Sequence, residues 1–73
     1  MSVKEFKNWL ENILEDVEDL EFIVSTFVND EESTDEELVD YFIDNLIDEK
    51  IIRALLVNRS YFWDFRYIKD LNF

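Results

Sequence analysis

Residues 3–27 carry the strongest fold signal of the chain and read VKEFKNWLENILEDVEDLEFIVSTF. Eight apolar residues in this stretch recur at alternating steps of three and four: Val3, Phe6, Leu10, Ile13, Val17, Leu20, Val24 and Phe27. This spacing places them on one face of an α-helix of about seven turns. Ser2 and Glu5 match a capping box at its start. The stretch therefore predicts one long amphipathic helix.

The next segment predicts a second amphipathic helix. Residues 29–33 form a polar, acidic connection, and Thr34 with Glu37 matches another capping box. Acids in the first turn complement the positive end of the helix dipole. The expected apolar face comprises Leu38, Val39, Phe42, Ile43 and Leu46, and the opposing acidic stripe comprises Glu36, Asp40, Asp44 and Asp48.

The helical phase changes near Asp48. If the same helix continued, the apolar residues after this point would fall on its acidic face, so we expect an end or a kink at residues 48–50. A third, short helix over about residues 50–58 would then bury Ile51, Ile52, Leu55 and Leu56.

Two structures compete for the C-terminal segment. Residues 58–60 favour a turn, after which Ser60 can cap a last helix through about Leu71, with one face formed by Phe62, Phe65 and Ile68 or Lys69. An alternation of aromatic residues favours a strand instead: Tyr61, Trp63, Phe65 and Tyr67. That strand would pair residues 61–68 with residues 51–57 in a hairpin.

Phe62 and Ile68 lie on the wrong face for the strand, which favours the helical solution. The expected fold is therefore all-α, with residues 1–73 forming one domain built as a small bundle of three to four helices. The alternative is two helices plus a C-terminal β-hairpin.

Composition narrows the function. The 73 residues include no Cys, His, Gly or Pro. The chain therefore lacks thiolate nucleophiles, histidine bases, the usual zinc ligands and the glycines of nucleotide-binding loops. Its carboxylates are predicted to face solvent, whereas a carboxyl catalyst needs an apolar pocket. We expect a non-enzymatic protein with no cofactor and no metal site. Lacking a signal peptide and an apolar span, it is expected in the cytoplasm, away from membranes.

The charge is concentrated in the middle of the chain. Residues 1–10 sum to +1, residues 11–49 to −16 and residues 50–73 to +3, which together give the net charge of −12. The middle segment holds sixteen acids and no Lys or Arg. Such a block destabilises a compact state through self-repulsion, and it disfavours direct binding to nucleic acid. The aromatic residues beside Arg59 and Arg66 resemble a base-stacking platform, but core packing is the preferred interpretation.

The acidic run indicates imitation of nucleic acid. Residues 11–21 hold six carboxylates, about one per 3 Å along a continuous helix, and one DNA strand presents a phosphate about every 3.4 Å. We therefore expect the chain to occupy the basic cleft of a nucleic-acid-binding host protein, with exposed aromatic residues as an apolar anchor. The predicted binding residues are Glu11, Glu15, Glu18, Asp19, Asp30, Glu31, Glu32, Asp40 and Asp44.

Two resemblances agree with this interpretation. In size and charge the chain resembles the small acidic proteins with which phages and mobile elements block host nucleases, restriction enzymes and CRISPR effectors. Residues 33–39, STDEELV, are similar to the start of the second helix in colicin nuclease immunity proteins, which are acidic helical inhibitors. The Tyr-rich short helix and the Pro and Gly of that family are missing, so its binding residues are not carried over.

Besides a nuclease immunity protein, which the second resemblance implies, the alternative is an interaction or assembly module that binds through its apolar seam, with the acids serving only to keep it in solution. A homodimer is one form of this alternative. The acidic residues that flank the seam would repel each other in two parallel copies. Binding by the mimic should weaken with salt and be competed by DNA, whereas the module should be indifferent to both.

Overall fold

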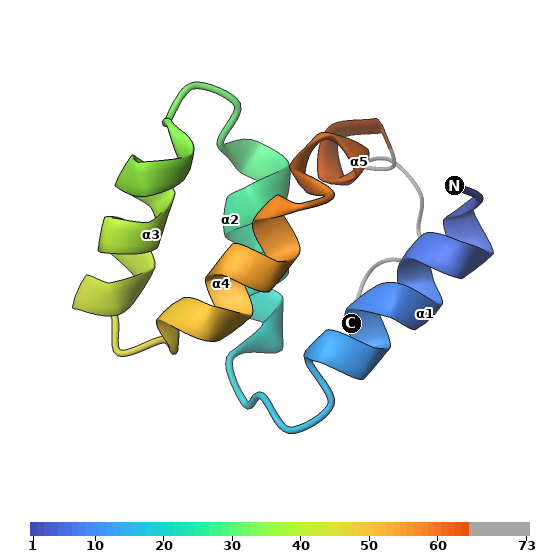
Figure 1. The fold of residues 1–73 in the computed structure, drawn as a ribbon, viewed down its shortest axis with the longest axis horizontal. Helices are drawn as coiled ribbons and strands as arrows, with labels where there is room; N and C mark the ends of the chain where they lie inside the picture. Colours follow the sequence, from blue (N-terminus) through green and yellow to red (C-terminus); the bar gives the residue numbers. More distant parts are fainter. Residues whose placement is uncertain (65–73) are drawn as a thin grey trace.

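The structure is a computed structural model that describes residues 1–64, and within them every regular element is a helix (Figure 1). The helices are α1 (Val3–Ile13), α2 (Leu20–Asn29), α3 (Asp35–Asp44), α4 (Glu49–Leu56) and α5 (Arg59–Asp64). The all-α prediction is confirmed. The hairpin alternative is wrong for the described residues, because residues 51–56 lie in α4 and residues 61–64 form the last part of α5. The part of the predicted last helix beyond Asp64, including Phe65, Ile68 and Lys69, lies outside the described residues.

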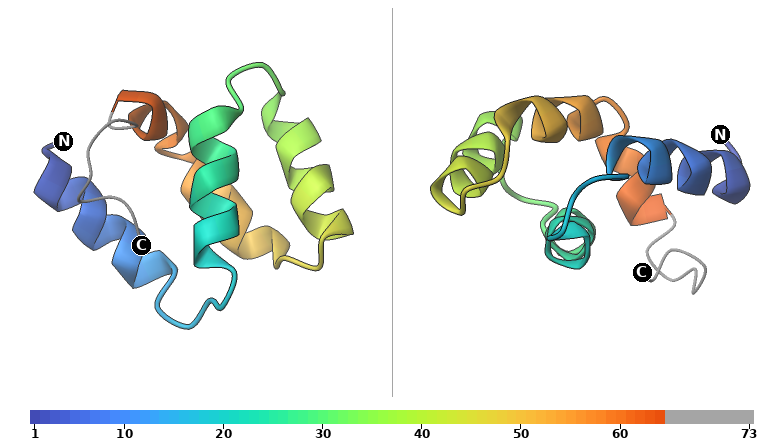
Figure 2. Two further views of the ribbon diagram at one scale, coloured as in Figure 1. Left: turned by 180° about the vertical axis from the view of Figure 1, so that it is seen from behind. Right: turned by 90° about the horizontal axis from the view of Figure 1, so that it is seen from below.

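The five helices lie in two layers. In the views of Figure 2, α4 lies between α3 and α1 in one layer, while α2 and α5 pack together in the other. The connection between α2 and α3 is at one end of the molecule, and the α1–α2 and α3–α4 connections are at the opposite end (Figure 1). One side of α2 therefore faces the other layer, and its opposite side faces solvent.

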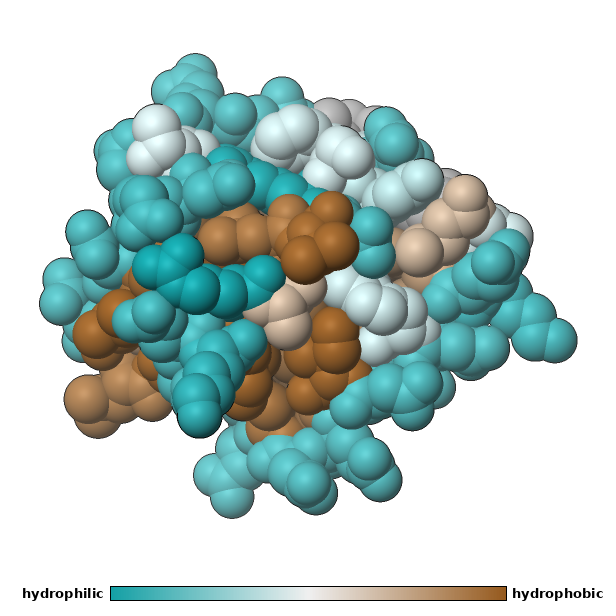
Figure 3. Space-filling view, in the orientation of Figure 1, coloured by the Kyte–Doolittle hydropathy of each residue, from teal (hydrophilic) through white to brown (hydrophobic). Residues whose placement is uncertain are grey.

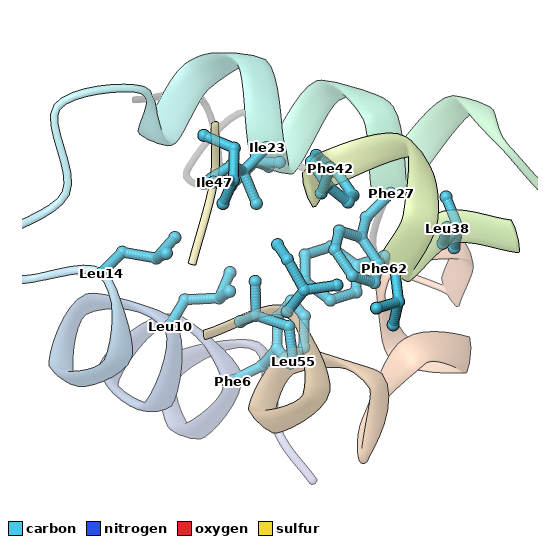
Figure 4. Close-up of a cluster of buried hydrophobic side chains, with 13 residues drawn as sticks. Phe6, Leu10, Leu14, Ile23, Phe27, Leu38, Phe42, Ile47, Leu55 and Phe62 are labelled. Atoms are coloured by element: carbon cyan, nitrogen blue, oxygen red, sulfur yellow. The ribbon is translucent and has the colours of Figure 1, made fainter. Parts of the chain in front are cut away.

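Four phenylalanines link the helices through the core. Phe6 of α1 packs edge-on against Phe62 of α5, with ring centroids 5.1 Å apart. Phe62 stacks on Phe27 of α2 at 4.7 Å, and Phe27 stacks on Phe42 of α3 at 5.6 Å. All four are almost fully buried, and Ile52 and Leu55 of α4 complete the same cluster (Figure 4). Each helix thus contributes to a single core.

Both predicted capping boxes are confirmed. The Ser2 hydroxyl accepts a hydrogen bond from the Glu5 amide, and the Glu5 carboxylate accepts one from the Ser2 amide. Thr34 and Glu37 form the same pair of bonds at the start of α3. These bonds satisfy backbone N–H groups that have no partner within the helix.

The prediction of one long helix over residues 3–27 is wrong. The chain leaves the helix at Leu14 and resumes it at Leu20. Carboxylates spaced three and four residues apart between residues 11 and 21 repel one another. A continuous helix would also be about 40 Å long, whereas the molecule measures 30 Å along its longest axis. Folding back lets Leu14, Ile23 and Phe27 enter one core.

The second predicted helix is shorter than expected. Leu38, Val39 and Phe42 are buried as predicted, but Ile43 and Leu46 are 40% and 94% exposed. The assignment of these two residues to the buried face is wrong. Leu46 lies beyond the end of α3 at Asp44, and Ile43 lies in the last turn of α3 with its side chain only partly buried.

The predicted change of phase near Asp48 is confirmed. Asp48 does not extend the acidic stripe of α3; it is the N-cap of α4, where its carboxylate accepts a hydrogen bond from the Lys50 amide at 2.8 Å. In α4, Ile52 and Leu55 are fully buried, while Ile51 and Leu56 are partly buried.

The phenylalanine cluster predicts a large difference between two substitutions in α2. Phe27→Ala removes a ring that contacts two others in the core, and we expect it to lower the free energy of unfolding by about 3–5 kcal/mol. Phe22→Ala truncates the same side chain at a position that is 37% exposed, so we expect a loss of about 1 kcal/mol. Urea denaturation followed by circular dichroism measures both. Equal losses would show that the ring contacts of Phe27 do not organise the core.

Candidate acidic binding surface along α2

The solvent side of α2 carries two adjoining hollows. One, of about 790 Å³, lies against the C-terminal half of α2, the 30–34 connection and α3, and its acidic lining is Asp30, Glu31, Glu32 and Glu37. The other, of about 450 Å³, lies at the start of α2, and its acidic lining is Glu18, Asp19 and Glu21. Ser25 lines both hollows, so they form one continuous strip. We call the residues lining the two hollows the α2 face.

The α2 face brings together five of the nine predicted binding residues: Glu18, Asp19, Asp30, Glu31 and Glu32. The other four are exposed but line neither hollow: Glu11 is on α1, Glu15 follows it, and Asp40 and Asp44 are on α3. Glu21 and Glu37 join the face although they were not predicted as binding residues. Glu21 belonged to the acidic run at residues 11–21, which was a usable signal, whereas Glu37 was accounted for by its role in the capping box.

The carboxylates of residues 11–21 do not have the even, phosphate-like spacing that the sequence predicted. That spacing required a continuous helix with a uniform rise per residue, and the chain is non-helical between α1 and α2. The carboxylates of the α2 face instead form two groups at opposite ends of a ten-residue helix, which places the groups about 15 Å apart.

The centre of the α2 face is polar and aromatic. Phe22 and Tyr41 are 37% and 46% exposed, and their ring centroids are 6.1 Å apart. Ser25 and Thr26 lie along the floor of the larger hollow. An exposed aromatic pair between two acidic groups provides apolar contact area where a binding partner would need it.

The connection that carries Glu31 and Glu32 is held in place by Asp30. One oxygen of the Asp30 carboxylate accepts hydrogen bonds from the Glu32 amide at 3.2 Å and the Ser33 amide at 2.9 Å. These bonds form the side-chain turn that aspartate favours. The bond from the Ser33 amide is the main cause that lowers the pKa of Asp30. The Glu32 amide and the charge of Arg59 lower this pKa further. Asp30 therefore has a structural role within the acidic surface.

Arg59 of α5 also holds the 30–34 connection in place. Its guanidinium donates to the backbone oxygens of Asp30 and Ser33 and to the carboxylate of Asp35, the last at 2.8 Å. The Arg59 side chain is only 12% exposed, and its guanidinium lies 5.4 Å from the ring centre of Trp63. The connection is thus bonded to α5 as well as to itself.

The aromatic residues of α5 within residues 59–64 serve the core. Trp63 donates its indole N–H to the backbone oxygen of Phe27 at 3.2 Å, which satisfies a carbonyl in the last turn of α2. Phe62 is buried, and the Tyr61 ring centre lies 6.0 Å from that of Phe6. These contacts account for Tyr61 and Trp63 without a base-stacking platform. Tyr67 and Arg66 lie outside the described residues.

Arg53 and Arg59 pair with acids at the edge of α3. Arg53 contacts Glu36 at 3.1 Å and Glu49 at 2.8 Å, and Arg59 contacts Asp35. The hydrogen bonds and charge of Arg53 lower the pKa of Glu36. Asp35, Glu36 and Glu49 are not among the nine predicted binding residues. The two exposed pairs of Arg53 contribute little to stability, because solvent screens them. Their main effect is to neutralise charge locally.

Residues 1–64 contain no group of three or more acids placed to hold a metal ion. Among the helices that the structure describes, none combines the length and the apolar character needed to span a bilayer.

The hydrogen bonds that the Asp30 carboxylate accepts should contribute to the free energy of unfolding in a pH-dependent way. Because the folded-state pKa lies below the ordinary value of 3.8, this contribution is complete at pH values above about 4 and is lost as the pH falls through the folded-state pKa. Asp30→Ala should therefore lower the free energy of unfolding by about 1 kcal/mol at pH 7, and by less at pH 3. The control, Asp40→Ala, should change it by less than about 0.5 kcal/mol. A loss for Asp30→Ala that is the same at both pH values would contradict the role given to its carboxylate.

Comparison with protein-family models, with curated proteins and with solved structures finds no match to this chain. The α2 face is thus the candidate site, with two acidic groups, an aromatic centre, and a connection held by Asp30 and Arg59.

Proposed function

We propose that the chain is a non-enzymatic inhibitor, of the kind that phages and mobile elements direct at their hosts, which binds a basic nucleic-acid-binding protein through the α2 face. The carboxylates of this face take the place of phosphates in the partner's cationic cleft. The proposal is carried mainly by one observation, the segment of residues 11–49 with sixteen acids and no Lys or Arg, which provides every residue of the α2 face.

The spacing of the two acidic groups supports this proposal. A separation of about 15 Å along α2 corresponds to the axial rise of roughly four to five nucleotides in one strand of duplex DNA. A cleft that binds a short length of backbone could therefore contact both groups at once. The match is to the overall span of a nucleic acid, not to the position of each phosphate.

The bonding of the 30–34 connection also supports it. The bonds that Asp30 and Arg59 make to the connection, and the capping box that follows it, hold the backbone on which Glu31 and Glu32 stand. A surface already ordered in the free protein loses less conformational entropy on binding. Its charge would speed the encounter with a cationic cleft and orient the two proteins, while Phe22 and Tyr41 would add buried apolar area.

A second function, an assembly module that binds through apolar surface, is favoured by a different observation. Leu46 and Val57 are 94% and 79% exposed, and each offers apolar area that a partner could bury. For such a module the acids would contribute solubility alone. Salt dependence separates the two functions, because apolar burial is much less sensitive to ionic strength than charge pairing.

Two variants of equal net charge test the proposed function. The first neutralises four acids of the α2 face: Glu18→Gln, Asp19→Asn, Glu31→Gln and Glu32→Gln. The second neutralises four exposed acids that line neither hollow: Glu11→Gln, Glu15→Gln, Asp16→Asn and Asp40→Asn. Each variant has a net charge of −12 + 4 = −8, so a difference between them reports the position of the charges and not their sum.

The binding partner is obtained by passing a bacterial lysate over the immobilised chain, eluting with duplex DNA, and purifying the eluted protein. We expect the dissociation constant of the purified pair to rise about tenfold or more for the α2-face variant and about twofold or less for the control. For the unsubstituted chain it should also rise about tenfold or more between 50 and 300 mM NaCl. Equal weakening by both variants, or a complex indifferent to salt and DNA, would reject the proposal.

A further inference from the structure

The connection between α3 and α4 contains a leucine in a left-handed backbone conformation. Leu46 has φ 65°, a value that favours glycine or asparagine. The Leu46 amide donates to the Ile43 carbonyl at 3.0 Å, and the Ile47 amide donates to the Phe42 carbonyl at 2.9 Å. These two bonds form the Schellman motif that often ends a helix. The motif explains why the residue at position 46 is left-handed, but it does not explain why that residue is leucine.

Folding gains nothing evident from the Leu46 side chain. It is 94% exposed, whereas Ile47, the next residue, is buried in the core. Asn45, which would suit the left-handed position, is the residue immediately before it. A leucine at this position combines backbone strain with an apolar side chain in water, and backbone strain of this kind is often found at functional sites.

Leu46 belongs to an apolar surface with an acidic border. Ile43, in the last turn of α3, is 40% exposed. The acids on either side of Leu46 in the chain, Asp44 and Asp48, are both exposed. The α3–α4 connection lies at the lower left in Figure 1, and in the same orientation Figure 3 shows apolar atoms reaching the surface there among hydrophilic ones.

We infer that Leu46, together with Ile43, is an apolar anchor that docks against a basic amphipathic helix of the protein partner. The inference rests on the proposed function and identifies the part of the partner that lies beyond the α2 face. Leucine and isoleucine would pack on the apolar stripe of that helix, and Asp44 and Asp48 would face the Lys or Arg residues beside it. A second copy of this chain fits the surface poorly, because its own acidic border would repel Asp44 and Asp48.

This anchor differs from the one that the sequence predicted. Exposed aromatic residues were expected to fill that role, and Phe22 and Tyr41 of the α2 face remain available for contact. However, both of these rings contact Phe42 of the core. Packing within the chain therefore explains part of the need for aromatic residues at these two positions. The Leu46 side chain, in contrast, is 94% exposed.

The test uses a fluorescently labelled helical peptide with Leu along one face and Lys on its flanks. Two control peptides have Ala in place of Leu, or Glu in place of Lys. Leu46→Asn removes the apolar side chain and keeps a residue that tolerates the left-handed conformation. The matched control is Val57→Asn, which replaces an equally apolar residue that is 79% exposed and has an ordinary helical conformation. Fluorescence anisotropy measures binding, and circular dichroism measures the melting temperature.

We expect Leu46→Asn to weaken binding of the Leu/Lys peptide about tenfold, to leave binding of the Ala/Lys peptide unchanged, and to melt at or above the temperature of the unsubstituted chain. Val57→Asn should bind the Leu/Lys and Ala/Lys peptides as tightly as the unsubstituted chain does. Neither protein should bind the Leu/Glu peptide. The inference is overturned if the unsubstituted chain does not bind the Leu/Lys peptide, or if Leu46→Asn binds it unchanged. It is also overturned if Leu46→Asn melts well below the unsubstituted chain. The same holds if sedimentation shows that the unsubstituted chain is a dimer and that the substitution dissociates this dimer.

The α2-face variant, measured with the same peptide and with the DNA-eluted partner, distinguishes failure of this inference from failure of the proposed function. If Leu46→Asn binds the partner normally and the α2-face variant does not, the proposed function stands and the anchor is rejected. If Leu46→Asn weakens both interactions and the α2-face variant weakens neither, the anchor stands and the nucleic-acid mimic is rejected.

Discussion

The stacking of Phe27 between Phe62 and Phe42 is the contact on which the arrangement of the described helices depends. It joins α2 to α5 at 4.7 Å and to α3 at 5.6 Å between ring centres, and Phe62 extends the contact to α1 through Phe6. Because Phe27 points into the core, the opposite side of α2 must face solvent. The position of the acidic surface is therefore a consequence of which side of α2 is buried.

The negative charge works against this compact arrangement. Sixteen carboxylates in residues 11–49 repel one another with no cation inside the segment. Part of the repulsion is relieved at one edge, where Arg53 and Arg59 pair with acids of α3 and α4. Arg59 also bonds the connection next to the α2 face through two backbone oxygens. Arg59 thus orders the acidic surface through its backbone, and the ion pairs of Arg53 and Arg59 are made with acids outside the predicted set.

Features that depend on neighbouring residues could be predicted from the sequence, and features that depend on packing could not. The capping boxes at Ser2 and Thr34 need only residues three positions apart, and the end of α3 follows from a local change of phase. The turn between α1 and α2 gave no such signal, because the apolar spacing continues through it without a break. The strip joining the two acidic groups required α3 to lie beside the end of α2. An exposed leucine at position 46 was unpredictable, because apolar residues are ordinarily assigned to the core.

The α2 face, with its two acidic groups, should carry the strongest negative potential of the free protein, and residue-by-residue measurement of the surface potential determines whether it does. Paramagnetic relaxation of amide protons, recorded with a cationic and with an anionic nitroxide, gives the local potential near each amide. The most negative values should lie at the start of α2 and in the 30–34 connection, and should exceed those beside Glu11 on α1 and Asp40 on α3. A potential equally negative over the whole surface, or most negative beside Glu11 and Asp40, would contradict this arrangement.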